Sequence, residues 1–490
     1  MIDKDLLSIQ EARALVRAAR KAQESFRAFG QSQVDALVKA VADTVATKAE
    51  ELAAMAVEET GFGKVQDKKV KNLLASEKVW ECIREMKTVG VLNEDKTRKI
   101  LEIAVPVGVI AGIVPSTNPT STIIYKTLIS LKSGNGIVFT PHPSAKKCIG
   151  RTIEIIKGVL RDHNVCPDLV SCISIPTMQG SAELMRVADL ILATGGPGMV
   201  KAAYSSGTPA LGVGAGNVPA YIERTANVED AVAKIFASKT FDNGTICASE
   251  QSIITDACIA DKVRANVIAQ GGYFLEGEKL AKVKAIMERG NGSMNPDIVG
   301  RDAMAIAQKA GIDVPHGTRL LVSDEPGVGP RHPFSKEKLT ALLGFYVVND
   351  WQEACELSIK LLENGGIGHT MSIHTQSEEV IREFGMKKPV SRMVVNTPST
   401  QGAVGLSTSL FPSFTLGCGT AGGSSTSDNV TPLNLINVRR VAYDLGNMSV
   451  PSASACQTSA CQTSVGAGST QNIDINAVTA MIVEQLKKMV

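Results

Sequence analysis

The sequence has few histidines, almost no net charge and no long apolar run, and each of these shortages excludes a class of protein. Six histidines, and ten cysteines without a Cys-x-x-Cys pair, show no spacing typical of a metal site or a disulfide framework. A net charge of +2 gives no support for a nucleic-acid partner. No apolar run approaches the roughly 18 residues that span a bilayer, and the charged first residues lack the apolar centre of a signal peptide. We therefore expect a cytoplasmic protein that binds neither metal, nucleic acid nor membrane.

The first fifth of the chain is predicted to be helical. At 490 residues the chain is longer than one hydrophobic core usually serves, so two or three domains are expected. Apolar residues at three- and four-residue spacing predict helices from about Asp5 to Lys87, with a break at Gly61–Gly63. Apolar alternation on both sides of an Asn-Glu-Asp-Lys turn then predicts a β-hairpin over about residues 88–104.

Short buried apolar runs alternate with helical segments after this hairpin, which indicates a doubly wound α/β domain. The predicted strands are Val105–Pro115, Gly136–Thr140, Leu169–Ile175 and Leu190–Ala193, and the predicted helices are Ser121–Ser133, Ala145–Asp162, Ser181–Val187 and one from about Met199. A second α/β region is expected over 227–409, with helices Val228–Lys239 and Trp351–Asn364 and strands Gln251–Thr255, Arg319–Val322 and Leu342–Val348. Within it begins the glycine-rich stretch Gly405–Asn429, which is irregular and predicts a long functional loop.

Two short stretches carry residues suited to chemistry. The turn Thr194-Gly195-Gly196-Pro197-Gly198 joins a predicted strand to a helix, where backbone N–H groups can bind a diphosphate. It is not a GxGxxG motif, so a merely tight connection is an equal reading. Cys247 follows an Asn-Gly turn in a polar segment, and a thiolate there could attack an aldehyde to form a thioester. Composition alone favours a buried structural thiol, since Cys247 is one of ten cysteines.

The last part of the chain differs in composition from the rest. Residues 448–472 are rich in Ser, Ala, Thr, Gly and Gln and repeat Ser-Ala-Cys-Gln-Thr at Ser454 and Ser459, which predicts a flexible linker. Residues 473–490 carry apolar side chains at helical spacing and predict one amphipathic helix.

Several long motifs, in order, resemble the CoA-acylating branch of the aldehyde dehydrogenase family, the acetaldehyde/propionaldehyde dehydrogenases. The resemblance runs from about Ala12 to Gly446 and rests on VPVGVIAGIVPSTNPTST, FTPHPSAKK, GVGAGNVP, FDNGTICASEQ, GIGHTMSIHT and PSFTLGCGTAGGSSTSDN. It implies an α/β fold with a Rossmann-type nucleotide domain, an α/β catalytic domain and a small oligomerisation hairpin. The implied organisation is 1–226 for the N-terminal helices and nucleotide domain, 227–409 for the catalytic domain, 410–447 for a return segment to the active site and oligomer interface, and then the linker and helix.

The resemblance also assigns roles to residues. Cys247 is the implied nucleophile, and the Asn118 amide with the backbone N–H of Cys247 is the implied oxyanion hole. The implied cofactor-binding residues are Thr140, Pro141, His142, Thr194, Gly195, Gly196, Gly198 and Glu337. Without the resemblance, Asn118 reads as a turn residue before proline and Glu337 as a solvated charge. His369 is implied either to deprotonate the thiol of coenzyme A or to orient the site, and a hydrogen-bonding role alone is the other reading.

One position departs from the pattern of hydrolytic aldehyde dehydrogenases, which have a glutamate general base near the place of Val213. A general base contributes roughly 10²–10⁴-fold, so its absence predicts that a thioester on Cys247 is poorly hydrolysed and waits for coenzyme A. The implied function is oxidation of a short-chain aldehyde, acetaldehyde or propionaldehyde, to its acyl-CoA with NAD. Alternatives are another small aldehyde such as sulfoacetaldehyde, a hydrolytic dehydrogenase, or a non-catalytic cargo protein, which Asn118, Cys247 and Glu337 disfavour. No acidic residue follows His142 to reject a 2′-phosphate, so NADP stays open beside NAD.

The terminal helix resembles the encapsulation peptides that bring enzymes into bacterial microcompartments by docking on a shell protein. The other reading is a tail that packs on the enzyme's own oligomer. The resemblance implies a homodimer or homotetramer, located in the cytoplasm inside a microcompartment.

Overall fold

The strands of the described residues, 3–290 and 292–446, form three sheets in this computed structural model. The chain divides into two compact units, residues 1–442 and residues 443–490, and every element described below belongs to the first. The predicted linker 448–472 and terminal helix 473–490 lie outside the described residues.

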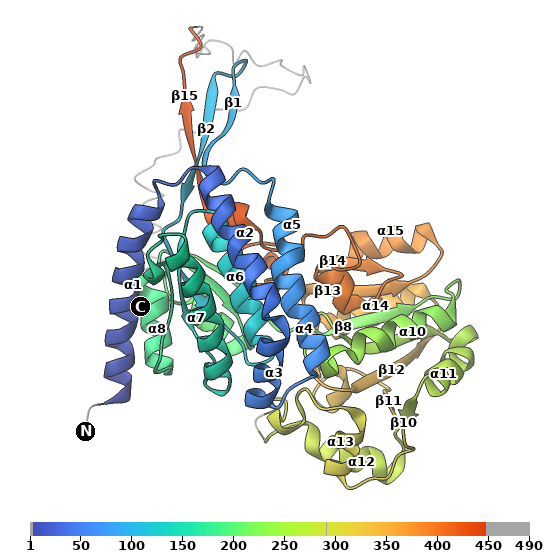
Figure 1. The fold of residues 1–490 in the computed structure, drawn as a ribbon. Coiled ribbons are helices and arrows are strands. Elements are labelled where there is room, and N and C mark those ends of the chain that lie inside the picture. Colours follow the sequence, from blue (N-terminus) through green and yellow to red (C-terminus); the bar gives the residue numbers. More distant parts are fainter. Residues whose placement is uncertain (1–2, 291, 447–490) are drawn as a thin grey trace, which may run out of the picture. The chain divides into compact units, whose positions relative to one another are not determined.

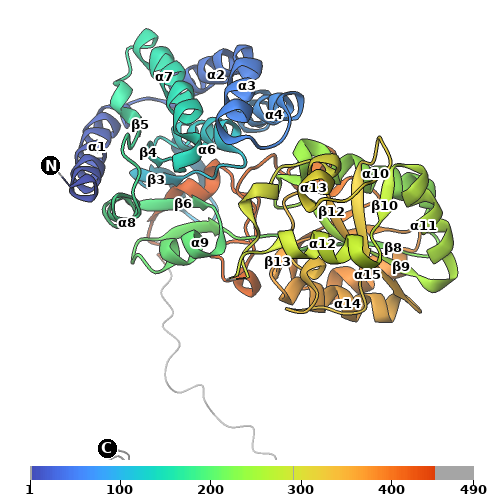
Figure 2. The same cartoon turned by 90° about the horizontal axis from the view of Figure 1, so that it is seen from below.

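The first sheet is parallel, with strand order β5-β4-β3-β6-β7. Its strands are β3 (Val109–Ile113), β4 (Gly136–Thr140), β5 (Val170–Cys172), β6 (Leu190–Thr194) and β7 (Ala210–Val213). Alternate side chains face opposite sides, as the period of two in a strand requires: Ile110 belongs to the buried apolar cluster on one face of the sheet, whereas Ala111 belongs to the cluster on the other face. Figures 1 and 2 show helices on both faces, which confirms the doubly wound α/β domain.

The helices around this sheet follow the predicted segments closely. They are α1 (Lys4–Phe26), α2 (Gln31–Thr47), α3 (Ala49–Thr60), α4 (Val65–Leu73), α5 (Val79–Ile83), α6 (Pro119–Lys132), α7 (Lys146–Asp162), α8 (Met178–Val187) and α9 (Pro197–Tyr204). Helices α4 and α5 are joined without a break by the π-helical turn η1 (Leu74–Lys78). The predicted break at Gly61–Gly63 separates α3 from α4, and Gly61 adopts a left-handed φ of 68° there.

The second sheet is also parallel, with strand order β10-β11-β12-β9-β8-β13-β14. Its strands are β8 (Val218–Ile222), β9 (Glu250–Asp256), β10 (Gly272–Phe274), β11 (Leu320–Asp324), β12 (Leu342–Val348), β13 (Gly368–His374) and β14 (Val390–Val395). Helices α10 (Val228–Lys239), α11 (Ala260–Ala269), α12 (Gly277–Met287) and α13 (Ala303–Ala310) pack on one face, and α14 (Trp351–Glu363) and α15 (Glu378–Lys387) on the other. Because β8 pairs with β9 and β13, this sheet begins at Val218, before the expected domain boundary at residue 227.

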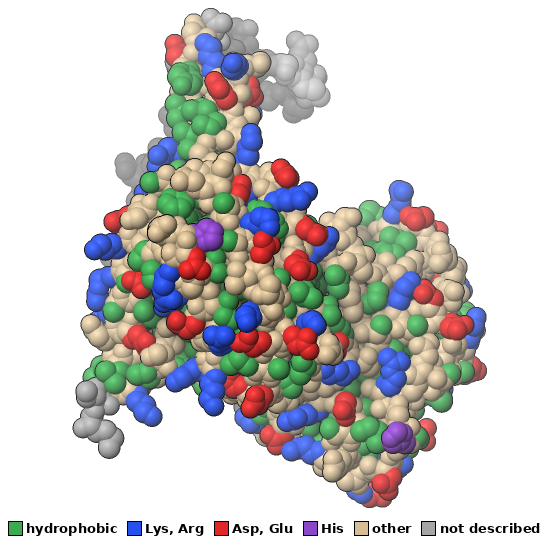
Figure 3. Space-filling model, viewed as in Figure 1, with side chains coloured by type: hydrophobic (Ala, Val, Ile, Leu, Met, Phe, Trp, Pro, Cys, Tyr) green, Lys and Arg blue, Asp and Glu red, His purple; other side chains and the backbone are tan. Residues whose placement is uncertain are grey.

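The third sheet is antiparallel and projects from the body of the first unit (Figure 1). It consists of β1 (Gly90–Asp95), β2 (Ile100–Pro106) and β15 (Ile436–Ala442), so the segment after the short helix α16 (Ser399–Ala403) returns to pair with β2. Figure 3 shows hydrophobic side chains gathered over this sheet, and its exposed apolar residues include Val91 and Val438. An exposed apolar sheet of this kind is typical of an association surface.

Three sequence boundaries were wrong, each for a local reason. The hairpin turn lies at residues 96–99, because the exposed strand β1 tolerates the polar residues Asn93–Asp95. The run Val105–Pro115 is not one strand but belongs to β2 and β3, which are separated at Gly108. Gly108 has a φ of 126°, and a Cβ added to it would lie 2.4 Å from Asp189 Oδ2. The third predicted strand is limited to β5, shorter than Leu169–Ile175.

Candidate functional site

A cavity of about 670 Å³ opens at the carboxyl ends of the strands in the first sheet. The chain leaves β3 through Val114–Asn118, β4 through Pro141–Pro143, β6 through Thr194–Gly196 and β7 through Gly214 and Ala215, and all four segments line this cavity. Strand β3 stands between β4 and β6, so the strand order reverses beside it. Ligands of open parallel sheets bind at such a reversal, outside the carboxyl ends of the strands.

Cys247 reaches the same cavity from the second half of the chain. It lies between the 3-10 turn η4 (Phe241–Gly244) and strand β9 and is partly exposed. Burial, and then the neighbouring charge of Glu337, raise the pKa of its thiol to about 12, whereas the guanidinium of Arg392 opposes this rise. The resting side chain is therefore a neutral thiol at physiological pH.

Nine of the eleven predicted site residues line this one cavity. They are Asn118, Thr140, Pro141, His142, Thr194, Gly195, Gly196, Cys247 and Glu337. Gly198 and His369 are not among the lining residues. Segments separated by more than a hundred residues in the sequence thus line the cavity that Cys247 reaches, where a bimolecular reaction would need them.

The Asn118 side chain is held from both ends of its amide. Its Oδ1 accepts a hydrogen bond from Lys71 Nζ at 2.7 Å, and its Nδ2 donates to the backbone oxygen of Thr245 at 3.1 Å and to Thr117 Oγ1 at 3.3 Å. Thr245 stands two residues before Cys247, so the amide N–H group points toward the loop that carries the thiol. A donor in this position is suited to stabilise an oxyanion formed at Cys247.

The turn after β6 offers polar groups without side-chain obstruction. Gly196 precedes the first residue of α9, and a Cβ added at Gly196 or Gly198 would meet nothing within 4 Å. Thr194 Oγ1 is buried without a hydrogen-bond partner and lies on the cavity. A hydroxyl without a hydrogen-bond partner beside a helix N-terminus fits a phosphate-bearing ligand, because phosphate oxygens would accept hydrogen bonds from the hydroxyl and from the N–H groups of the helix. Burial lowers the pKa of His142, so this imidazole at the cavity wall is neutral.

Glu337 is the one carboxylate among the described residues that line the cavity. Its Oε1 accepts a hydrogen bond from the backbone N–H of Gly216 at 2.9 Å. Burial raises its pKa to about 7, although the Gly216 N–H and the ammonium groups of Lys239 and Lys338 oppose this rise. Val213 stands at the end of β7 in the same cavity, and it is 2% exposed in an apolar cluster against which Cys247 packs.

His369 lies behind the loop of Cys247 and is fully buried. A Cβ added to Gly216 would lie 1.9 Å from the backbone oxygen of Cys247 and 3.2 Å from His369 Nδ1, so Gly216 separates the two residues. Nδ1 is 2.8 Å from Thr370 Oγ1, and Nε2 has no hydrogen-bond partner. Burial, and then the charge of Arg392, lower the pKa of His369 to about 3, which keeps the ring neutral. Its role in deprotonating coenzyme A stays a prediction.

Sequence reasoning missed the polar groups behind Asn118. Lys68 and Lys71 of α4 both bond to Asp242 of η4, and all three side chains are at most 3% exposed. Lys68, Lys71 and Asn72 fall on one face of the helix, and the next turn on this face carries buried Ala75 and Ser76. The helical spacing places these residues together but does not show that their face is buried.

Comparisons with known proteins agree on one family. The sequence pattern of the aldehyde dehydrogenase family matches residues 6–276. Over 448 residues the chain is 45% identical to the bifunctional aldehyde-alcohol dehydrogenase AdhE of Escherichia coli K12, which covers 90% of this chain and 50% of that protein. Over 447 residues it is 38% identical to the succinate-semialdehyde dehydrogenase (acetylating) of Clostridium kluyveri, covering 91% of this chain and 98% of that one. The chain therefore spans about half the length of the bifunctional relative.

Solved structures give the same result. An acetylating aldehyde dehydrogenase from Geobacillus thermoglucosidasius superposes with a TM-score of 0.89 at 50% identity, covering 91% of this chain and 99% of that one. A propionaldehyde dehydrogenase from the fucose utilisation microcompartment of Clostridium phytofermentans has a TM-score of 0.80 at 29% identity, covering 88% and 97%. The propionaldehyde dehydrogenase of Rhodopseudomonas palustris, with bound propionyl-CoA, has a TM-score of 0.80 at 28% identity, covering 88% and 94%. No helix in the described part of the chain is both long and apolar enough to cross a membrane.

Proposed function

Because the chain belongs to the aldehyde dehydrogenase family, and within it to the acylating aldehyde dehydrogenases, we propose that it converts acetaldehyde or propionaldehyde to the acyl-CoA with NAD and coenzyme A. The observation that carries this proposal is that Val213, near whose place hydrolytic aldehyde dehydrogenases have a glutamate, lines the same cavity as Cys247. The bound propionyl-CoA of the Rhodopseudomonas palustris protein supports the same acceptor.

The first half of the proposed reaction uses Cys247 and the groups around it. The Cys247 sulfur attacks the aldehyde carbon and forms a thiohemiacetal, whose oxygen carries the developing negative charge. Asn118 Nδ2 and the backbone N–H of Cys247 would donate to that oxygen. Attack requires loss of the thiol proton, and the charge of Arg392 is the neighbouring influence that favours the thiolate. Oxidation then leaves an acyl thioester on Cys247.

The dinucleotide fits the residues present around the glycine turn. Thr194 has an unpartnered buried hydroxyl, and Gly196 leaves the start of α9 open, so Thr194, Gly195 and Gly196 would hold the diphosphate. Thr140, Pro141 and His142 would contact the adenosine ribose, and Glu337 the nicotinamide ribose. When bound, the nicotinamide supplies the hydride acceptor for the oxidation.

The second half of the proposed reaction is transfer of the acyl group from Cys247 to coenzyme A. Val213 cannot accept a proton from water, so hydrolysis of the thioester lacks a general base at that position. A hydrolytic dehydrogenase is the less favoured alternative for this reason. The described residues that line the cavity include neither lysine nor arginine, which also disfavours an anionic substrate such as sulfoacetaldehyde.

The test is CoA-dependent NADH formation by the Cys247→Ala variant. We expect no activity with acetaldehyde or propionaldehyde, whereas the control Cys258→Ala, which changes an exposed cysteine, should retain the activity of the parent. Residual activity above background in Cys247→Ala would contradict the assignment of Cys247 as the nucleophile. Product analysis with and without coenzyme A separates acyl-CoA from free acid, and C2 to C4 aldehydes with NAD and NADP identify the preferred substrates.

We further propose that the enzyme is a homodimer or homotetramer whose projecting sheet contributes to assembly, and that residues 473–490 dock on a microcompartment shell in the cytoplasm. The microcompartment origin of the Clostridium phytofermentans protein supports the second idea. Removal of residues 447–490 should abolish association with the shell and leave catalysis intact. Unchanged shell association of the truncated enzyme would refute the docking role.

A further inference from the structure

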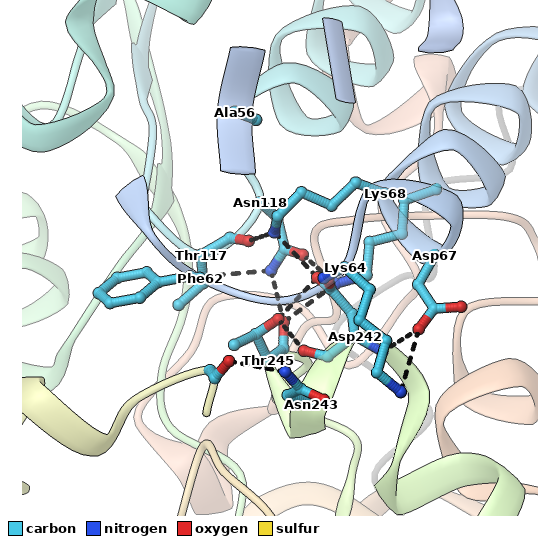
Figure 4. A network of polar contacts seen from close by, with 12 residues as sticks. Ala56, Phe62, Lys64, Asp67, Lys68, Thr117, Asn118, Asp242, Asn243 and Thr245 are labelled. Carbon is cyan, nitrogen blue, oxygen red and sulfur yellow. Dashed lines mark hydrogen bonds and ion pairs between the residues drawn. The ribbon is translucent and has the colours of Figure 1, made fainter. Parts of the chain in front are cut away.

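A buried cluster of one carboxylate and two ammonium groups lies directly behind Asn118. Figure 4 shows Lys68, Asn118, Asp242 and Thr245 brought together from distant parts of the chain. Lys68 Nζ is 2.9 Å from Asp242 Oδ2, and Lys71 Nζ donates to the same oxygen. The side chains of Lys68, Lys71 and Asp242 are 3%, 2% and 0% exposed. Ion pairs this deeply buried are costly to desolvate, so stability alone is a weak reason for the cluster.

The local sequence explains how these groups meet. Lys68 and Lys71 are three residues apart on α4, so they project from the same face of the helix. Asp242 adopts a left-handed φ of 49°, which turns its carboxylate toward this face. Gly63 makes room for it, since an added Cβ would lie 1.8 Å from Asp242 Oδ1. The carboxylate also accepts from the backbone N–H of Lys64 at 2.8 Å.

Besides Asp242, the two lysines donate hydrogen bonds to different acceptors. Lys71 donates to Asn118 Oδ1 at 2.7 Å and to the backbone oxygen of Thr245 at 3.2 Å. Lys68 instead donates to the backbone oxygen of Thr117 at 2.8 Å. An amide has similar shapes at its oxygen and nitrogen ends, and an ammonium donor accepts only the oxygen end as a partner. Lys71 and the Thr245 carbonyl therefore fix together which end of the Asn118 amide faces the loop of Cys247, because the ammonium group binds only the oxygen end and the carbonyl only the nitrogen end.

We propose that Lys71 is a positioning residue for acyl chemistry at Cys247: held by Asp242, it orients and polarises the Asn118 amide so that Nδ2 donates to the oxyanion. This inference rests on the proposed role of Asn118 as an oxyanion donor. Lys68 holds Asp242 and the backbone at Thr117 and has no contact with the amide. The amide is therefore pre-oriented before charge develops, which is the condition under which such donors are most effective.

The charge of Lys71 acts on Asn118 through its direct hydrogen bond to the amide oxygen. Lys68 and Lys71 share the Asp242 carboxylate, and Asp67 is a second negative charge that acts on Lys71. Burial first, and the charge of Lys68 second, lower the pKa of Lys71 to about 8 against the opposing influence of Asp242 and Asp67. These are the charged groups that face Lys71 from α4 and η4. As pH rises through about 8, Lys71 loses its proton, and with it part of its hold on Asn118.

The experiment uses the full-length enzyme and 4-nitrophenyl acetate, which needs neither a dinucleotide nor an aldehyde. The Cys247 thiolate attacks the ester carbonyl carbon, a sulfur–carbon bond forms, and the carbon–oxygen bond to 4-nitrophenolate breaks after a tetrahedral oxyanion. The variants are Lys71→Met and its matched control Lys68→Met, each of which removes one ammonium group from Asp242. Alkylation of Cys247 by iodoacetamide, which forms no oxyanion, is measured in parallel.

We expect Lys71→Met to lower the single-turnover acylation rate by about tenfold or more, mainly in its limiting value at saturating ester, with little change in the alkylation rate. Lys68→Met should change acylation much less. Asn118→Ala removes the donor itself and should lose roughly 10²–10³-fold. Equal losses in the two lysine variants, or equal losses of acylation and alkylation in Lys71→Met, would overturn the positioning role.

A pH dependence of the unmodified enzyme and the Asn118→Ala variant test the positioning role and the oxyanion role separately. In the unmodified enzyme the ratio of acylation to alkylation rate should fall as pH rises through about 8, and a constant ratio from pH 7 to 9.5 would contradict the proposal even if Lys71→Met failed to fold. An undiminished acylation rate in Asn118→Ala would instead contradict the oxyanion role of Asn118 in the proposed function. The two failures are thus distinguishable.

Discussion

Val213 controls, in the proposed mechanism, what happens to the thioester on Cys247. A glutamate at this buried position would have a raised pKa and stand beside the sulfur, both of which suit a general base. We expect Val213→Glu to increase formation of free acid from aldehyde and NAD without coenzyme A by roughly 10²-fold or more. The measurement is product analysis under single-turnover conditions.

The matched control for this prediction is Val213→Gln, which has nearly the same shape and no basic carboxylate. If Val213→Gln released as much acid as Val213→Glu, disruption of the cavity rather than base catalysis would explain the result. If neither variant released acid, Val213 would not occupy the position of the missing base.

The acidity of Cys247 depends on Glu337. The charge of Glu337 raises the thiol pKa, and Glu337 itself, with a pKa of about 7, is ionised in the range where the thiol begins to titrate. Removal of this negative charge stabilises the thiolate, so Glu337→Gln should shift the pH profile of iodoacetamide alkylation to lower pH. Glu250→Gln is the control, because Glu250 is also buried with a pKa raised to about 7 but does not act on Cys247. An unchanged profile in Glu337→Gln would contradict the assigned coupling.

At the level of residues, the sequence predicted the groups that touch the cavity and missed those behind them. Cys247, Asn118 and Glu337 stand in recognisable motifs, and the structure places all three on one cavity. The bond from Lys71 to Asp242 joins residues 171 positions apart, and no local pattern connects them. The choice between buried and solvated lysine depends on tertiary packing of α4, which a helical spacing alone does not determine.

The connection between α3 and α4 is shaped around the Asp242 carboxylate. Gly63 has a left-handed φ of 77°, and Asp242 Oδ1 occupies the space that a Cβ at Gly63 would need. We expect Gly63→Ala to lower stability by roughly 1–3 kcal/mol and to reduce acylation, because both the backbone and the buried cluster are disturbed. Thermal unfolding and the 4-nitrophenyl acetate rate measure the two effects.

Gly90 provides the control for backbone strain alone. It has the same φ of 77°, and an added Cβ would meet nothing within 4 Å. Gly90→Ala should therefore show a smaller loss of stability and an unchanged acylation rate. Equal effects in the two variants would mean that the contact between Gly63 and Asp242 contributes nothing.

Elements with strong apolar patterns were predicted almost to the residue, such as Gly136–Thr140 and Val228–Lys239. The boundary error in Val105–Pro115 arose because an apolar pattern does not indicate which sheet each part of the run joins. The run Val105–Pro115 is apolar throughout, yet its first part pairs with β15 and its later part with β4 and β6. Only the backbone conformation at Gly108 separates the two sheets, and a run of apolar letters does not reveal it.

At the scale of the whole molecule, the projecting sheet is the surface we expect to assemble. Val438 of β15 is 37% exposed on this sheet. A charge there would have to be desolvated on association, so Val438→Glu should shift the enzyme toward smaller oligomers, as measured by light scattering after size-exclusion chromatography. The control is Ile268→Glu, at a 56% exposed apolar position on α11. An unchanged mass for Val438→Glu would exclude this residue from the interface.

The π-helical turn between α4 and α5 has a consequence for how the chain can vary in length. Lys71 and Ile83 both face inward although they are 12 positions apart (83 − 71). In a regular α-helix each residue turns the chain by about 100°, so residues this far apart would point about 120° away from each other. The wider turn Leu74–Lys78 holds an extra residue and takes up most of that difference. Loss of a single position here would turn the π-helical turn into a regular α-helical one, and because 11 positions amount to about 1100°, the two residues would still point within about 20° of each other. Active relatives should therefore tolerate a single-residue gap at this point, as well as exchanges of the exposed Glu77 and Lys78, whereas a gap elsewhere in α4 would rotate Lys71 by about 100° against α5.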